Sequence, residues 1–141
     1  MNTLNFLDAN VWLGLLWGRH IHAEKAKEWF ESSGEEKFLF CRITQMTVLR
    51  LLTTQAVMGN DVKKMNEAWD LWDHVCADDR IEFVSEPEAI EREFRKVSSR
   101  GNPSPKVWVD AYLLAFASVA GLKLVTFDRG LGSRGADVQV L

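Results

Sequence analysis

Three aspartates occupy positions where carboxylates could act together on one reaction. Asp8 directly follows the apolar run at 4–7, and Asp128 directly follows the apolar residues 124–127. If both runs are strands of one parallel sheet, their carboxyl ends lie at the same edge, where such sheets bind ligands. Each residue also has an ordinary local explanation, because Asp commonly caps a helix or forms an Asx turn. The shared edge is what favours a functional site.

Asp110 is harder to explain by local structure. Ser104 and Pro105 form a helix-start pattern, with Ser as the N-cap and Pro at the first helical position. This pattern places Asp110 more than one turn inside an apolar helix, where neither capping nor the helix dipole stabilises a carboxylate much. A buried carboxylate on such a helix needs a partner. Asp110 therefore binds a metal ion, pairs with a basic residue such as Arg50 or Lys106, or lies on an exposed face of the helix.

Three carboxylates on one edge of a sheet repel one another and need a positive counter-charge. Mg²⁺ or Mn²⁺ takes oxygen ligands, and Mg²⁺ is commonly held by few carboxylates, several waters and a substrate phosphate. Such an ion lowers the pKa of bound water and stabilises the leaving oxygen of a phosphodiester. The sequence shows no Ser-His-Asp pattern, P-loop or glycine-rich dinucleotide fingerprint. We therefore predict that Asp8, Asp110 and Asp128 are both metal ligands and catalytic residues.

Short strands alternate with helices along the chain. Apolar runs predict strands at 4–7, 37–41, 81–84, 122–127 and 138–141. Helical spacing of apolar residues predicts helices at 9–17, 22–32, 43–52, 62–75, 86–97 and 105–120. Strands separated by helices pair in parallel through right-handed crossovers, with helices on both faces of the sheet. The expected fold class is α/β, a three-layer α/β/α sandwich around a parallel sheet of four to five short strands.

Length and composition indicate one domain over residues 1–141, large enough to bury a core. The 17 basic and 20 acidic residues give a net charge of -3, which argues against a protein that coats DNA with a basic surface. The longest apolar segment contains Asp110 and is too polar for a membrane span, and the first residues lack the basic start of a signal peptide. Cys41 and Cys76 show no disulfide or metal-ligand spacing. We expect a cytoplasmic protein with no membrane contact.

Three segments of the chain resemble the successive acidic motifs of PIN domains. They are Phe6-Leu7-Asp8-Ala9-Asn10-Val11-Trp12, Trp108-Val109-Asp110-Ala111-Tyr112-Leu113 and Val125-Thr126-Phe127-Asp128-Arg129-Gly130. The segments at 41–45 and 49–53 also resemble one branch of the VapC toxins of type II toxin–antitoxin systems. The likeness spans essentially the whole chain and keeps the family's order of motifs.

The resemblance implies an activity and a set of partners. It implies a parallel α/β/α fold and a Mg²⁺- or Mn²⁺-dependent endoribonuclease that hydrolyses RNA through metal-activated water. It also implies a homodimer, neutralised by a cognate VapB-like antitoxin whose tail reaches the active site. By position, Asp8, Asp110 and Asp128 would be the metal-site carboxylates. Asn10 and Thr126 would support the site by hydrogen bonding to a carboxylate or water.

Arg50 departs from the family pattern. PIN domains usually carry a further acid, most often Glu, on the helix expected at 43–52, and Arg50 stands at the matching position. The change favours one ion over two, and Arg50 either pairs with an active-site acid, contacts phosphate or is an exposed helix arginine. It leaves open a catalytically degenerate module that binds RNA or protein without cleavage. A receiver-like signalling domain would need a Lys after its last strand, and none follows Lys123.

Aromatic and basic residues could complete the site. Trp108 is the tryptophan best placed to contact a base, whereas the others have spacings typical of core or dimer contacts. His20, His22 and His74 show no zinc-ligand spacing and are typical of solvated or helix-end positions. A basic rim around the acids could come from Arg19, Arg42, Arg129 and Arg134.

Overall fold

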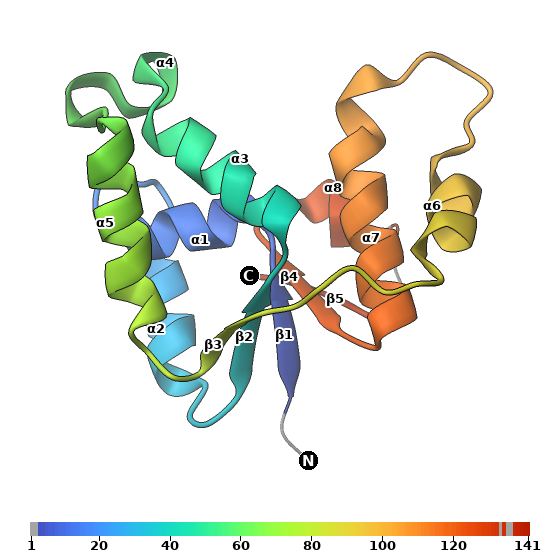
Figure 1. The fold of residues 1–141 in the computed structure, drawn as a ribbon, viewed down its shortest axis with the longest axis horizontal. Coiled ribbons are helices and arrows are strands. Elements are labelled where there is room, and N and C mark those ends of the chain that lie inside the picture. The colour runs from blue at the N-terminus through green and yellow to red at the C-terminus, as the bar shows by residue number, and fades with distance from the viewer. Residues whose placement is uncertain (1–2, 133, 135–136) are drawn as a thin grey trace.

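The computed structural model describes residues 3–132, 134 and 137–141, and within them five parallel strands form one sheet in the order β3-β2-β1-β4-β5 (Figure 1). The strands are β1 (Leu4–Leu7), β2 (Lys37–Phe40), β3 (Ile81–Phe83), β4 (Lys123–Thr126) and β5 (Val138–Val140). The central strand is β1, whose Phe6 pairs with Leu39 of β2 on one side and Leu124 of β4 on the other. The prediction of a short-stranded parallel sheet is confirmed.

Helices cover both faces of this sheet and complete three layers (Figure 1). One face carries α1 (Ala9–Leu16), α2 (Ala23–Ser32), α3 (Arg42–Leu52) and α5 (Met65–Cys76). The other carries α6 (Ile90–Ser98) and α7 (Trp108–Ala120). Short connections are α4 (Gln55–Met58), η1 (Gly59–Asp61), η2 (Pro105–Val107) and α8 (Arg129–Gly132). Neighbouring strand residues such as Phe6 and Leu7 enter opposite cores, as the pleat requires.

Two helices begin later than the sequence pattern predicts. The helix expected from residue 62 begins at Met65, because the Glu67 carboxylate accepts a 2.8 Å hydrogen bond from the Lys64 amide and caps it there. The helix expected from residue 86 begins at Ile90, since Glu86 precedes Pro87 and a residue before proline is disfavoured in helical conformation. Over the described residues, no helix combines the length and apolar character needed to cross a membrane.

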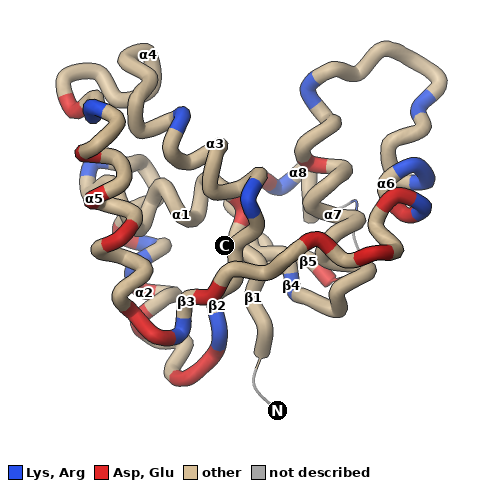
Figure 2. The backbone as a smooth tube through the Cα atoms, in the orientation of Figure 1, with Lys and Arg blue, Asp and Glu red and all other residues tan. Residues whose placement is uncertain are grey.

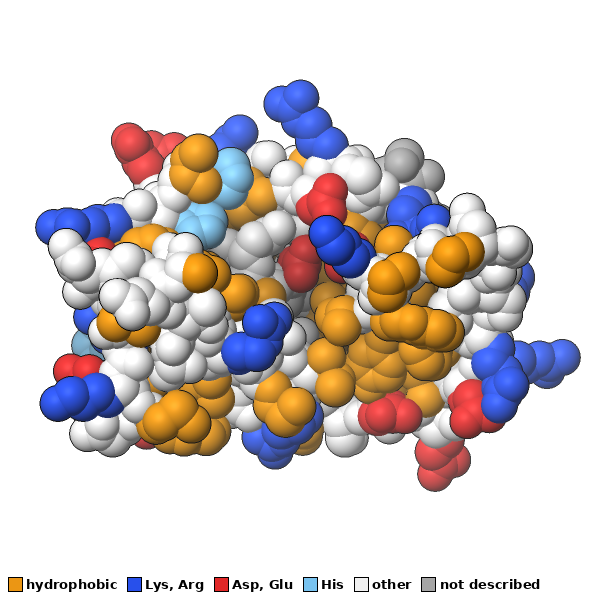
Figure 3. Space-filling view, turned by 90° about the horizontal axis from the view of Figure 1, so that it is seen from above, with side chains coloured by type: hydrophobic (Ala, Val, Ile, Leu, Met, Phe, Trp, Pro, Cys, Tyr) orange, Lys and Arg blue, Asp and Glu red, His pale blue; other side chains and the backbone are white. Residues whose placement is uncertain are grey.

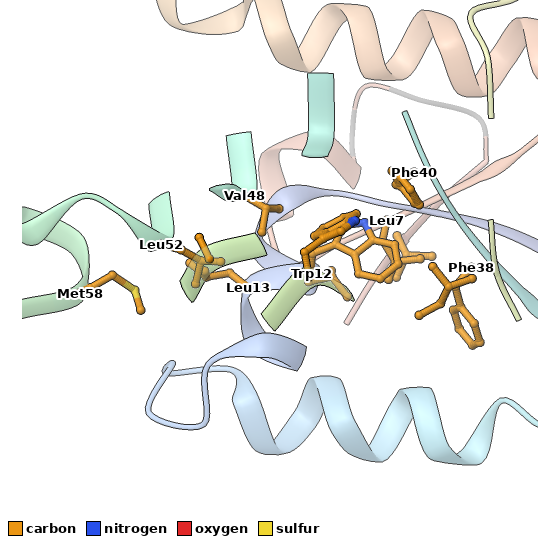
Figure 4. Close-up of a cluster of buried hydrophobic side chains, with 13 residues drawn as sticks. Leu7, Trp12, Leu13, Phe38, Phe40, Val48, Leu52 and Met58 are labelled. Atoms are coloured by element: carbon orange, nitrogen blue, oxygen red, sulfur yellow. The ribbon is translucent and has the colours of Figure 1, made fainter. Parts of the chain in front are cut away.

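The core beneath α1 combines aromatic and aliphatic side chains (Figure 4). Trp12 is fully buried, and its ring lies edge-on to Phe40 at 6.1 Å and tilted against Trp72 at 5.5 Å between centroids. These contacts tie α1 to β2 and α5. The expectation of core tryptophans holds for Trp12 and Trp72, whereas Trp69 is 45% exposed. The cluster fixes the start of α1, and therefore the position of Asp8.

Gly14 permits the close approach of α1 and α2. A Cβ atom on this residue would lie 3.0 Å from the Cβ of Ala26. We expect Gly14→Ala to lower the free energy of unfolding by about 1 kcal/mol, because overpacking outweighs the gain in helix propensity. Urea titration of the two single variants and of the Gly14→Ala/Ala26→Gly double variant measures this. The double variant should be more stable than the sum of the single effects, and simple additivity would contradict the packing argument.

Candidate active site

Asp8 stands at the junction of β1 and α1. Its backbone amide donates a 2.9 Å hydrogen bond to the Val125 carbonyl, which continues the pairing of β1 with β4. Its side chain acts as the N-cap of α1, with Oδ1 accepting a 2.8 Å bond from the Ala9 amide. The ordinary local role of this residue is therefore present. Asp8 therefore both caps α1 and lies at the carboxyl edge of the sheet.

Thr126, the last residue of β4, connects the two strand-end aspartates. Its buried hydroxyl donates a 2.7 Å hydrogen bond to Oδ2 of Asp8 and accepts a 3.0 Å bond from the Asp128 amide. The predicted support of a carboxylate by Thr126 is confirmed. Asn10 reaches Asp8 only through Thr126. Its side chain donates to the Thr126 hydroxyl at 3.4 Å and accepts from the Phe127 amide at 3.3 Å. No carboxylate of the described chain accepts a hydrogen bond from Asn10.

Asp128 begins the short helix α8. Its Oδ1 accepts a 2.8 Å hydrogen bond from the Gly130 amide, which is the local Asx contact expected for an aspartate at this place. The turn predicted at 128–130 is therefore the entry to a short helix. Asp128 is exposed, in contrast to the buried Thr126 two residues before it.

The placement of Asp110 differs from the sequence prediction. Residues Pro105–Val107 form a 3₁₀ turn, α7 begins at Trp108, and Asp110 lies in its first turn. The Ser104 side chain forms no cap, because its hydroxyl donates to the Asn102 side chain at 2.9 Å instead. The prediction that Ser104 caps the helix is wrong, and so is the placement of Asp110 deeper than one turn. At this position the helix dipole does favour a carboxylate.

The three carboxylates nevertheless lie in one electrostatic environment. Burial raises the pKa of Asp110, and the charges of Asp8 and Asp128 raise it further, whereas Arg134 opposes the shift. Burial also raises the pKa of Asp8, against the hydrogen bonds from Thr126 and Ala9, and the charge of Asp128 adds to the rise. Asp8 and Asp128 are therefore near enough to Asp110 for their charges to shift its pKa.

The surroundings of the acids are mixed in charge. Figure 2 shows charged residues of both signs on α2 and α6, whereas the charged residues of α5 are acidic. Acidic side chains gather in a hollow at the middle of one face, with basic side chains beside them (Figure 3). Of the predicted basic rim, Arg134 acts on Asp110, whereas Arg19 pairs with Asp61 at 3.6 Å and Arg42 lies over the Phe83 ring.

The oxygen donors suit a hydrated hard cation. Over the described residues, no three His, Cys, Asp or Glu side chains are arranged as a ready-made metal cage. Mg²⁺ does not require one, because it is usually held by one or two carboxylates together with waters and substrate phosphate. Burial is the main cause of the raised pKa values of Asp8 and Asp110, and the charge of Asp128 raises both further. A divalent cation is the counter-charge that the donor set fits.

Arg50 lies apart from this chemistry. It is exposed on α3 and lines a cavity of about 320 Å³ together with Met46, Leu49, Thr53, Met65, Ala68 and Trp69. Among the ion pairs of the described chain none includes Arg50 or Lys106, so neither predicted partnership with Asp110 is present. Trp108 is 55% exposed and meets Phe94 edge-on, a position open to contact from outside.

Comparison with known proteins agrees with this arrangement. The family model described as the PIN domain matches residues 6–135. The chain belongs to the PIN-domain family. Ribonuclease VapC41 of Mycobacterium tuberculosis is 38% identical to it over 133 residues, which cover 91% of both chains. The family resemblance of the acidic motifs is thereby confirmed.

Solved structures of PIN-domain toxins share the fold. VapC20 of Mycobacterium tuberculosis, a toxin that cleaves the sarcin–ricin loop, superposes with a TM-score of 0.69 at 14% identity and covers 93% of this chain and 95% of its own. VapBC2 of Rickettsia felis, solved bound to a DNA fragment from its promoter, gives a TM-score of 0.69 at 12% identity and covers 97% and 96%. At these identities the likeness establishes the three-layer α/β/α architecture.

Thr126 provides a test of the hydrogen-bond network. We expect Thr126→Val to lower the free energy of unfolding by about 1–2 kcal/mol, because the buried Asp8 carboxylate and Asp128 amide lose their shared partner. Catalysis should fall by about 10- to 100-fold, as for other residues that orient metal ligands. Chemical denaturation and RNA cleavage measure the two effects. Thr126→Ser keeps the hydroxyl and should restore most of both, and equal losses in the two variants would contradict the assignment.

Asp110 provides a test of the shared electrostatic environment. Because its pKa is raised on folding, the folded chain binds this proton more tightly than the unfolded chain, and the ionised group lowers stability at neutral pH. Without divalent metal, Asp110→Asn should therefore raise the thermal midpoint at neutral pH, by about 2 °C. The gain should vanish as pH falls through the ordinary aspartate range near about 4. The matched variant Asp70→Asn, at an exposed position of α5, should show no such gain, and a destabilised Asp110→Asn would contradict the argument.

Proposed function

We propose that this chain is a metal-dependent endoribonuclease and the toxin of a type II toxin–antitoxin module. The observation that carries the proposal is the convergence of Asp8, Asp110 and Asp128 at the carboxyl edge of the sheet, where burial and mutual repulsion raise the pKa values of Asp8 and Asp110. Membership of the PIN-domain family and identity to a ribonuclease, VapC41, support it. The reaction is hydrolysis of an RNA phosphodiester bond.

The three aspartates have different roles in this site. Asp8, Asp110 and Asp128 would hold one Mg²⁺ or Mn²⁺, which supplies an activated water and stabilises the leaving oxygen. Both oxygens of Asp8 already accept a hydrogen bond, so Thr126 and the Ala9 amide hold this carboxylate in one orientation. No hydrogen bond to the Asp110 carboxylate occurs within the described residues, and its pKa is raised. Asp110 is therefore the group best suited to accept the proton of the attacking water.

Arg50 does not weaken the catalytic proposal. The cavity that it lines contains none of the three acids, so the arginine gives no reason to regard the site as degenerate. It does remove the fourth carboxylate that a second tightly held ion would require. The proposed site therefore binds a single ion, and its remaining coordination positions are filled by water and substrate oxygen.

We also propose partners and a cellular location for this protein. The VapBC2 structure joins a toxin of the same fold to its antitoxin, which supports a VapB-like antitoxin as partner of this chain. We propose that the toxin is a homodimer of single domains spanning residues 1–141, that it acts on RNA in the cytoplasm, and that it has no membrane contact.

RNA cleavage by the wild type and by Asp110→Asn tests the function. We expect Mg²⁺- or Mn²⁺-dependent cleavage by the wild type and a loss of at least about 100-fold in Asp110→Asn, since the site loses a ligand charge and its proton acceptor. Mg²⁺ should also raise the melting temperature of the wild type more than that of the variant. Asp70→Asn is the control and should keep wild-type activity. Equal cleavage by the wild type and by Asp110→Asn would contradict the assignment of the site.

A further inference from the structure

The connection between α1 and α2 carries a chain of aromatic rings that ends beside the active site. The Trp17 and His20 rings meet at 6.0 Å between centroids, and the His20 and His22 rings at 5.6 Å. The His22 ring then stacks on Phe127 at 4.1 Å, with only 9° between the two planes. Trp17 is itself anchored, because its indole nitrogen donates a 2.8 Å hydrogen bond to Asp61. The rings therefore hold residues 20–22, which we call the 20–22 segment, in one position.

The last ring of this chain belongs to the wall of the active site. Phe127 lies between Thr126 and Asp128, and its backbone amide donates to the side chain of Asn10. The His22 imidazole thus stacks on the residue that precedes Asp128, a proposed metal ligand. The space-filling view shows histidine side chains and an exposed apolar side chain on the same face as the acidic hollow (Figure 3). The 20–22 segment therefore lies close to the proposed metal ligands (Figure 3).

The 20–22 segment exposes groups that the described fold does not use. Ile21 is 87% exposed, the most of any large hydrophobic residue in the described chain. The His22 backbone amide donates to Nδ1 of His20 at 3.1 Å, and burial and the neighbouring His22 lower the pKa of His20. The neutral His20 ring therefore carries its proton on Nε2, which has no hydrogen-bond partner among the described residues. Neither ring nitrogen of His22 has one either.

We propose that the 20–22 segment binds a nucleotide of single-stranded RNA next to the bond that is cut. A nucleobase combines a flat apolar face with polar edges, and it finds here an exposed apolar side chain beside imidazole rings with free hydrogen-bonding nitrogens. The segment contains no Asp or Glu, unlike the acidic hollow beside it (Figure 3), so it can hold the RNA by its base rather than by a phosphate. The inference rests on the proposed function, since it assigns a substrate subsite to the same active site.

Binding of RNA tests the subsite without interference from cleavage. The probe is a short fluorescent single-stranded RNA, and its dissociation constant is measured by anisotropy in the presence of Mg²⁺. The parent is the Asp110→Asn chain. It is compared with the same chain carrying Ile21→Ser, His22→Ala or His22→Phe. Ile21→Ser and His22→Ala should each weaken binding about tenfold, whereas His22→Phe keeps the stacked ring and should stay within about twofold. In the otherwise wild-type chain, Ile21→Ser should raise KM for cleavage and leave kcat unchanged.

Two matched variants separate the subsite from general effects. Met65→Ser removes a similarly exposed apolar side chain from α5, and His74→Ala removes an exposed histidine, so both should bind RNA as the parent does. Unchanged RNA affinity in Ile21→Ser and His22→Ala is expected if the segment faces a protein partner instead. This result would overturn the subsite but leave the proposed function intact. A parent chain that binds no RNA would contradict the proposed function and the inference together. In an otherwise wild-type chain, a Mg²⁺-induced rise in melting temperature that is retained in His22→Ala shows that the metal site is intact.

Discussion

Repulsion among three carboxylates at one edge of a sheet is the constraint on which the rest of the structure depends. The chain offsets part of it by placing each acid at the beginning of a helix. Asp8 caps α1, Asp110 lies in the first turn of α7, and Asp128 opens α8. Amide groups and helix dipoles at these ends supply partial positive charge, most of it from the two longer helices. The pKa values of Asp8 and Asp110 are raised nevertheless, mainly by burial and further by the neighbouring carboxylates.

Holding the acids in this arrangement requires a rigid framework on both faces of the sheet. Trp12 fixes α1 against β2 and α5, and Gly14 lets α2 approach it closely. On the other face, Phe116 of α7 stacks on Phe6 of β1 at 4.7 Å, which ties the helix of Asp110 to the strand of Asp8. The two cores therefore connect the acids through packed rings. Because packed cores resist small displacements, the carboxylates cannot relax apart without disturbing this packing.

Much of this fold could be predicted from local sequence. Apolar runs followed by Asp8 and Asp128 locate two strand ends, and alternation of strands with helices is sufficient for a parallel three-layer sandwich. Helix starts were less predictable, because they depend on single contacts. Serine is a common N-cap residue, yet the Ser104 hydroxyl donates to the Asn102 side chain, and a 3₁₀ turn precedes α7. The sequence argument for Asp110 was thus correct in its conclusion about convergence and wrong in its reason.

Side-chain partnerships between distant segments could not be predicted at all. Nothing local indicates that His22 stacks on Phe127, or that Arg50 shares a cavity with Met65 and Trp69. Thr126 is the intermediate case, because its place at a strand end beside Asp128 suggests a supporting role but leaves its partner undetermined. In the structure the single hydroxyl donates to one aspartate and accepts from the backbone of another. A hydroxyl group can do both. A carboxamide at this position would be a larger side chain, and a carboxylate would add a fourth negative charge to the site. In this chain the acids are therefore supported by a small neutral hydroxyl group.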